Sequence, residues 1–216
     1  MNAWQTTFFG LKQIPHELTA FEIEAFFTFT ATERQVIEQR RRSALKLGLA
    51  LQIGFLRMSG RLLDAVRIVP AVLWRHLGEQ FTVAAPDLAS LRAMYGRGNT
   101  LFEHQQLACE VLDFHWPSKQ QRRALSSALR LELTRTRDRQ QLLIFARRWL
   151  YEHRLLIRGR CRDWTPAADD IFGRLLRQTG VPTRVTACAQ SRRSDQRAEA
   201  PDLHRPRRQL SSQERG

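Results

Sequence analysis

Residues 30–63 read TATERQVIEQRRRSALKLGLALQIGFLRMSGRLL, and this stretch decides the fold class. Large apolar residues occupy every second position from Leu45 to Phe55, which by itself is typical of a strand. Most of them are leucine, however, only Ile53 is β-branched, and small or polar residues lie between them. At helical spacing, one face gathers side chains that would let another helix approach closely. These are Ala44, Leu45, Gly48, Leu49, Gln52 and Phe55. The stretch therefore predicts a buried helix with arginines at both ends.

Helix starts are marked by capping-box patterns, in which a hydroxyl residue is followed three positions later by an acid or an amide. There are four: Thr19 with Glu22, Thr30 with Glu33, Thr100 with Glu103, and Ser118 with Gln121. Gly60 is a plausible helix stop. We expect helices at 19–28, 31–42, 43–58, 70–80, 86–95, 100–112, 118–134, 138–156 and 166–178. Because no hairpin signal or β-rich run is present, we predict an all-α protein with a compact, multi-helix fold.

The composition points to a polyanionic partner. The chain has 216 residues and a formal net charge of +14, with a pI of about 11.3. Its only lysines are Lys12, Lys46 and Lys119, so arginine supplies almost all of the positive charge. Forked guanidinium donors suit phosphate, although a genome rich in G and C would also favour arginine codons. The excess of positive charge is the firmer signal, and it favours nucleic acid.

Other bulk features exclude several classes of protein. The three cysteines, Cys109, Cys161 and Cys188, form no C-x-x-C pair, which argues against a zinc module and a disulfide scaffold. The longest apolar stretch, Leu47 to Leu56, is about half of the ~20 residues that a membrane span requires. No secretory leader is evident at the N-terminus. We expect a bacterial cytoplasmic protein associated with the nucleoid, with no membrane contact.

The chain divides into four parts by composition. We expect an N-terminal arm at 1–14, a helical subdomain at 15–113, a second helical subdomain at 117–179 and a disordered basic tail at 181–216. The tail has few large apolar residues and cannot bury enough surface to offset its ordering entropy. An alternative interpretation of the tail is a shift of the reading frame near residue 178.

The candidate contacts to nucleic acid are cations in two regions. On a helical wheel of 118–134, Ala124, Leu125, Ala128 and Leu129 cluster on one side. The other side gathers basic and hydroxyl residues, as a helix lying along a groove or a phosphate ridge requires. An ordinary solvated face is the alternative. The candidates are Arg40, Arg41, Arg42, Lys46, Arg57, Arg61, Lys119, Arg122, Arg123 and Arg130.

No pattern of residues indicates an active site or a metal site. The six histidines are scattered, and none has the spacing to another histidine or to a cysteine that metal ligands show. The pair Asp169–Asp170 follows Thr165 and Pro166, and it suits a helix start better than catalysis. We expect no cofactor, no metal and no small-molecule substrate.

Several segments, in their order and spacing, resemble the N-terminal region of the Tn3 family of replicative transposases. The resemblance covers roughly residues 15 to 178. The segments are RRRSALKLGLALQIGFLRMSGR at 40–61, VPAVLWRHLGEQF at 69–81, NTLFEH at 99–104, LDF at 112–114 and ARRWLYEHRLLI at 146–157. Members of that family are several times longer, and their acidic catalytic triad lies far C-terminal to this region. Nothing in this chain can be matched to the triad.

The resemblance implies a non-catalytic, DNA-binding fragment that recognises the terminal inverted repeats of a transposon. Arginines would contact phosphates, and one helix would dock in the groove of double-stranded DNA. Two alternatives stay open. The chain could be a helical interaction protein that dimerises with or inhibits full-length transposase, or it could be a decayed gene product without function.

Overall fold

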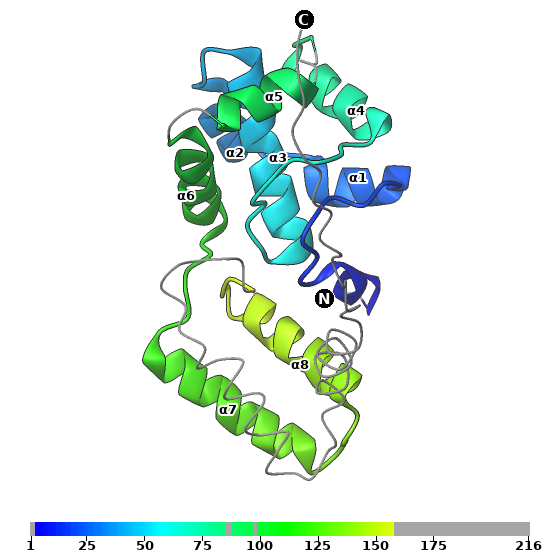
Figure 1. Ribbon diagram of the computed structural model, residues 1–216, viewed down its shortest axis with the longest axis vertical. Coiled ribbons are helices and arrows are strands. Elements are labelled where there is room, and N and C mark those ends of the chain that lie inside the picture. The colour runs from blue at the N-terminus through cyan, green and yellow to red at the C-terminus, as the bar shows by residue number, and fades with distance from the viewer. Residues whose placement is uncertain (1–2, 85–87, 97–98, 158–216) are drawn as a thin grey trace, which may run out of the picture. The chain divides into compact units, whose positions relative to one another are not determined.

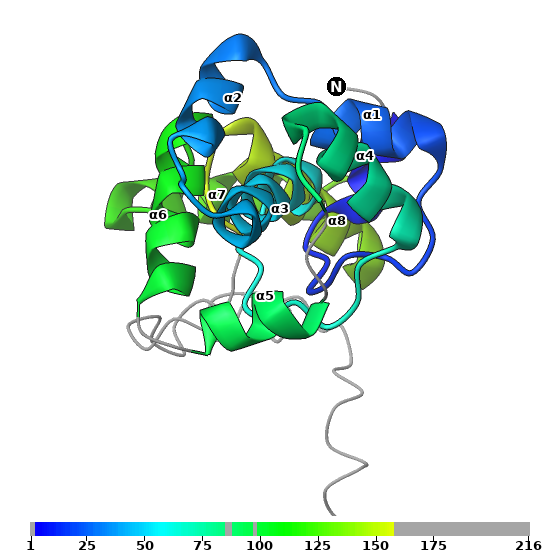
Figure 2. The same ribbon diagram turned by 90° about the horizontal axis from the view of Figure 1, so that it is seen from above.

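Helix α3 (Ser43–Ser59) is the element around which the other N-terminal helices pack. In the computed structural model, which describes residues 3–84, 88–96 and 99–157, every residue of α3 from Leu47 to Leu56 is buried. Seen from above, the helix lies among α1, α2, α4, α5 and α6 (Figure 2). Since a helix surrounded on all sides needs apolar residues all round, the strand-like alternation of leucines in this stretch is explained.

The prediction of an all-α protein is confirmed. Among the residues that the structure describes, the only β pairing is an isolated bridge between His115 and Leu155. None of the described helices is long and apolar enough to cross a membrane. Figure 1 shows the elements in chain order. They are a 3-10 helix Ala3–Phe8, α1 Ala20–Phe27, α2 Ala31–Glu38, α3, α4 Ala71–Phe81, α5 Leu88–Tyr95, α6 Thr100–Leu112, α7 Lys119–Leu133 and α8 Arg139–Glu152.

Three of the four predicted capping boxes form with both of their hydrogen bonds. They are Thr19 with Glu22, Thr30 with Glu33, and Ser118 with Gln121. The fourth prediction, Thr100 with Glu103, is wrong. Thr100 is already the first residue of α6, and Asn99 occupies the N-cap position without a side-chain cap. The hydroxyl therefore lies one residue too far along the chain to cap the helix.

Two helices end earlier than predicted. Helix α2 ends at Glu38 instead of residue 42, because Arg42 takes an extended backbone (φ −99°, ψ 139°) as the N-cap of α3. Helix α8 ends at Glu152 instead of residue 156, and Arg154 has a left-handed backbone (φ 54°). The residues that follow α8 are held as an extended segment. The Leu156 amide donates to the His115 carbonyl at 3.0 Å.

Two glycines allow close contacts that any side chain would obstruct. At Gly54, an added Cβ would lie 2.2 Å from Cδ1 of Phe27, so the glycine lets α1 pack directly against α3. Gly60 ends α3 as predicted, in a left-handed conformation (φ 67°). Its carbonyl accepts the amide of Ile157 at 2.7 Å, which ties the segment after α8 to the end of α3.

The N-terminal segment packs onto the rest of the fold. Phe9 is buried and stacks on Tyr151 with ring centroids 4.3 Å apart, and Ile14 belongs to the hydrophobic core. The described part of the predicted arm is therefore a structural element. The predicted helix at 166–178 and the predicted tail lie outside the described residues, and the division into two helical subdomains stays a prediction.

Candidate nucleic-acid interface

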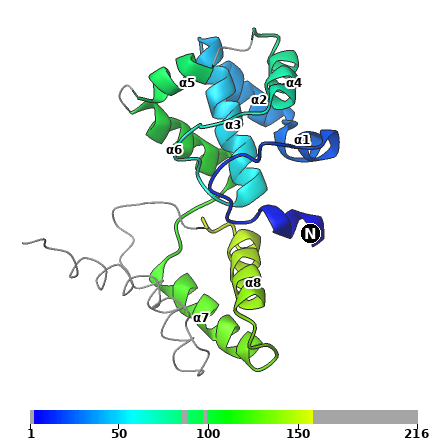
Figure 3. The same cartoon turned by 45° about the vertical axis from the view of Figure 1, so that its right-hand side comes forward.

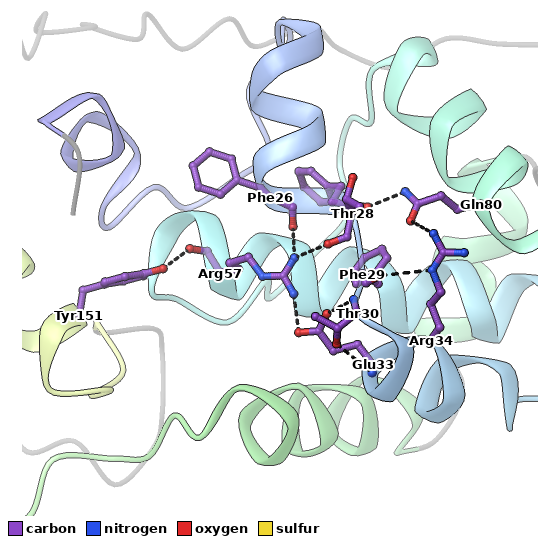
Figure 4. A network of polar contacts seen from close by, with 10 residues as sticks. Phe26, Thr28, Phe29, Thr30, Glu33, Arg34, Arg57, Gln80 and Tyr151 are labelled. Carbon is purple, nitrogen blue, oxygen red and sulfur yellow. Dashed lines mark hydrogen bonds and ion pairs between the residues drawn. The ribbon is translucent and has the colours of Figure 1, made fainter.

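Arg57, which the sequence predicts as a phosphate contact, makes its hydrogen bonds inside the fold. One terminal nitrogen, Nη1, donates to the carbonyls of Phe26 at 2.9 Å and Thr28 at 2.8 Å. The other, Nη2, forms a 2.5 Å ion pair with Glu33 (Figure 4). The guanidinium of Arg57 thus ties the end of α1 to the start of α2. Because these donors are used inside the fold, we leave Arg57 out of the candidate interface.

Glu33 takes part in the same network. Burial raises the pKa of its carboxyl, but the hydrogen bond and charge of Arg57, together with Thr30, outweigh burial and hold that pKa below its usual value. One carboxylate oxygen, Oε2, accepts the Thr30 amide at 2.8 Å in the capping box. The carboxylate therefore caps α2 and neutralises Arg57 together. Figure 4 also shows Arg34 and Gln80 extending the network toward α4.

The predicted cluster of three arginines divides into one inward and two outward side chains. Arg40 is half-buried, and its charge lies near the buried His104 of α6. Burial first, and the charge of Arg40 second, lower the pKa of His104 to about 4. Arg41 and Arg42 are exposed in the turn between α2 and α3. Of the three arginines, only Arg41 and Arg42 are fully accessible to a ligand.

Lys46 and Arg61 do not join these arginines in a single patch. Lys46 lies in the first turn of α3, and Arg61 follows the last turn, so the length of the helix separates them by roughly 22 Å at 1.5 Å per residue. Both side chains are half-buried. The structure therefore does not gather the cations of residues 40–61 into one site.

On α7 the structure brings three predicted cations into line. Lys119, Arg123 and Arg130 are all exposed, and at ~100° per residue they fall within about 40° of one another. They extend over roughly 16 Å of the helix. We call these three residues the α7 stripe. Such a row of cations along one helix face suits a phosphate backbone.

The buried face of α7 differs from the wheel prediction. Leu125, Leu129 and Leu133, four residues apart, face inward, and Leu129 is buried, whereas Ala124 is exposed. The face is therefore centred on the leucines, since alanine has little surface to bury. This rotation places Arg122 at the half-buried border, where its Nε donates weakly to the Ser118 carbonyl at 3.4 Å. Arg122 is accordingly not part of the stripe.

Helices α7 and α8 form an antiparallel hairpin (Figure 3). Its connecting turn adds exposed arginines that sequence reasoning missed: Arg135, Arg137 and Arg139. Arg135 pairs with Glu132 at 3.5 Å. Residues 117–157 hold ten basic and three acidic residues, whereas residues 15–113 hold eleven of each. A count of charge by segment would have found this asymmetry without a structure.

The hairpin is held to the N-terminal helices through its C-terminal end. The Tyr151 hydroxyl donates to the Arg57 carbonyl at 2.6 Å, and the Ile157 amide donates to the Gly60 carbonyl at 2.7 Å. Burial raises the pKa of Tyr151, so its hydroxyl stays a neutral donor. In the part of the chain that is described, no three His, Cys, Asp or Glu side chains gather as metal ligands would. The hairpin thus presents its cations on two helices that are hydrogen-bonded to the end of α3.

Comparison with known proteins now identifies the family. A family model described as "Domain of unknown function (DUF4158)" matches residues 7–160. The chain belongs to that family. It is 57% identical to the transposase for insertion sequence element IS1071 in transposon Tn5271 from Comamonas testosteroni. The 157 aligned residues are 73% of this chain and 16% of the relative. The resemblance to the N-terminal region of Tn3-family transposases is confirmed.

A second relative of this DUF4158 chain is more distant. The chain is 28% identical to the transposase for transposon Tn1546 from Enterococcus faecium. The 105 aligned residues are 49% of this chain and 10% of the relative. The chain thus spans about a sixth or less of the length of these curated relatives. A role related to transposases follows from both matches.

Proposed function

We propose that this chain binds double-stranded DNA at transposon ends through its α7–α8 hairpin. The observation that carries the proposal is the placement of charge. Ten basic residues against three acidic ones lie in residues 117–157, while the helices before them are balanced. Net positive charge held on one surface is what a phosphate backbone recognises.

The α7 stripe would supply the main phosphate contacts. Lys119, Arg123 and Arg130 lie along one line of a fifteen-residue helix, so successive side chains can follow a strand or the edge of a groove. The arginines of the connecting turn would extend this contact, and Arg41 and Arg42 would add a second, smaller one. Reading of bases in the major groove would fall to side chains that flank the stripe on α7.

In this role the chain recognises DNA and carries out no strand chemistry. Transposon terminal repeats are the proposed ligand because the relatives are transposases. The remaining steps of transposition would belong to other parts of a transposase. In a bacterial cell, a protein that binds DNA in this manner would be found on the nucleoid.

The test is a binding titration by fluorescence anisotropy. One labelled duplex carries an end of the IS1071 element, and a second duplex of equal length carries the scrambled sequence. We expect tighter binding to the element's end, together with an affinity that falls steeply with salt. Replacement of the α7 stripe (Lys119→Ala, Arg123→Ala, Arg130→Ala) should reduce the slope of log affinity against log salt by roughly 2.7, at about 0.9 per phosphate contact.

The matched control replaces one lysine and two arginines that are exposed outside the hairpin: Lys12, Arg67 and Arg75. This variant carries the same change in net charge, so a smaller loss of affinity would assign the binding to the stripe. Equal affinity of the unmodified chain for both duplexes at physiological salt would contradict recognition of transposon ends. If both variants lose the same amount of affinity, the binding is non-specific attraction of DNA to the net charge of the chain.

A further inference from the structure

A row of neutral side chains runs along α7 beside the α7 stripe. It consists of Gln120, Ser127 and Leu131, which fall within about 40° of one another at ~100° per residue. All three are exposed, and Leu131 is 60% exposed. We call these residues the neutral row. The middle of the row lies about 80° around the helix from the middle of the stripe, so a ligand bound to the stripe also meets the row.

The polar groups of the neutral row are not used within the described part of the fold. The hydroxyl of the neighbouring Ser126 donates to the Arg122 carbonyl at 3.0 Å. Neither the Ser127 hydroxyl nor the Gln120 side-chain amide forms a hydrogen bond with another described residue. Gln121, by contrast, is used in the capping box of α7. The hydroxyl and the amide of the row are therefore available to a ligand.

The chemistry of the row matches A·T base pairs. In the major groove, a glutamine can pair with both N6 and N7 of adenine, and an apolar side chain can contact the methyl group of thymine. Guanine is read mainly by arginine or lysine and cytosine by carboxylates, and the row contains neither. Gln120 and Leu131 lie about 16 Å apart along α7, which is the length of roughly five base pairs.

We propose that the neutral row reads A·T base pairs in the major groove, where Gln120 contacts an adenine and Leu131 contacts a thymine methyl. This inference rests on the proposed function, because the α7 stripe must bind the phosphates at the edge of the groove. A helix with its side chains is about 10–12 Å wide and the major groove is about 12 Å wide. Side chains on one flank therefore reach the backbone while the adjacent face points toward the bases.

Helix α8 also carries an exposed glutamine near an exposed apolar residue, Gln140 and Ile144. The cation one turn after Ile144 is Arg148, and it is already paired with Glu152 at 2.9 Å. A duplex on this face would bring its phosphates against the carboxylate of Glu152. The observations thus favour α7 as the helix that reads bases, and Gln140 is a matched control for Gln120.

The experiment selects duplexes from a pool with a randomised centre, using the intact chain, and sequences those that bind. We expect the wild type to enrich a motif with A·T pairs at fixed positions. Gln120→Ala should lose the preference for A·T at one of them, a loss of roughly 5- to 140-fold in discrimination for a bidentate contact. Gln120→Arg should change that position to G·C, because arginine pairs with guanine. Gln140→Ala should select the wild-type motif.

The contact of Leu131 is tested by fluorescence anisotropy on the motif so selected. Replacement of one thymidine at a time by deoxyuridine removes only the methyl group. At one position the affinity of the wild type should fall about fourfold, as expected for one methyl that loses an apolar contact. Leu131→Ala should not respond to the same replacement. Gln120 and Leu131 are exposed, so circular dichroism should show unchanged helix content in all these variants.

Several results would overturn the inference. They are a wild-type pool with no enriched motif or a motif of G·C pairs alone, a Gln120→Ala motif equal to that of the wild type, and a change of motif in Gln140→Ala instead. Equal losses on deoxyuridine for the wild type and Leu131→Ala would overturn the role of Leu131. The proposed function is judged separately, by the preference for the IS1071 end and by the salt slope of the stripe variant. If those hold while Gln120→Ala keeps the wild-type motif, only the neutral row is refuted.

Discussion

Replacement of Arg57 by leucine removes a side chain that bonds three groups inside the fold. The substitution removes the donors to two backbone carbonyls, those of Phe26 and Thr28, and the partner of the Glu33 carboxylate. The side chains of Arg57 and Glu33 are 20% and 11% exposed, so water can replace only part of what is lost. A leucine fills much of the same volume but satisfies none of these groups.

The expected loss follows from the cost of removing one member of such a pair. Removing one partner of a buried ion pair costs about 3–5 kcal/mol. Since both groups keep some contact with water, we take the lower end, about 3 kcal/mol of unfolding free energy. For a domain of this size, that corresponds to a fall in Tm of roughly 6–12 °C.

The assay is urea unfolding followed by circular dichroism at pH 7 and at low pH. The folded-state pKa of Glu33 lies below its unfolded value, so its contribution is present above the unfolded pKa and is lost as pH falls through the folded pKa. The wild type and Arg57→Leu should therefore differ more at pH 7 than at pH 3. Arg41→Leu, an exposed control, should stay within about 0.5 kcal/mol of wild type. A loss below 1 kcal/mol for Arg57→Leu would refute the reasoning.

Three other perturbations test separate parts of the fold. Gly54→Ala should lower Tm, because contact of the new methyl with Phe27 costs about 1–3 kcal/mol, more than the ~1 kcal/mol gained in helix propensity; a raised Tm would contradict the close packing. The buried His104 has a pKa of about 4, so the unfolded chain takes up a proton at higher pH than the folded chain does. The unfolding free energy of the wild type should therefore fall as pH drops from 6.5 toward 4. His104→Gln should flatten that fall in urea titrations. Ser118→Ala removes the capping box of α7 and should cost about 1 kcal/mol, with faster hydrogen exchange in the first turn of that helix; unchanged exchange would show that the cap is dispensable.

Local signals in the sequence predicted most of the helices. Capping boxes depend on residues three positions apart, so Thr19, Thr30 and Ser118 could be assigned from the chain alone. The burial of α3 followed from its apolar residues on every side. The wheel prediction for α7 fails for a local reason as well, because an alanine buries much less surface than Leu125 or Leu129. Weighting by side-chain area would have turned the predicted face toward the leucines.

Contacts between distant residues could not be predicted in this way. Arg57 looked like one member of a basic cluster, but its partner Glu33 lies 24 positions earlier and belongs to another helix. Nothing in the local sequence separates a guanidinium that binds carbonyls within the fold from one that faces solvent. The same holds for Arg40, whose neighbour His104 lies on α6. The apolar pocket lined by Leu62, Phe102 and Leu156 likewise joins residues from three separate stretches of chain.

The uneven placement of charge between the hairpin and the helices before it has a kinetic consequence. A molecule with a neutral part and a cationic part has a large electric dipole moment, so the field of a DNA duplex exerts a torque on it before any contact is made. Diffusing molecules would then arrive with α7 already turned toward the duplex, and a larger share of encounters would be productive. Neutralising the α7 stripe should therefore slow association as well as hasten dissociation. Moving the same charges to α4 or α5 should reduce the association rate even though the net charge is unchanged.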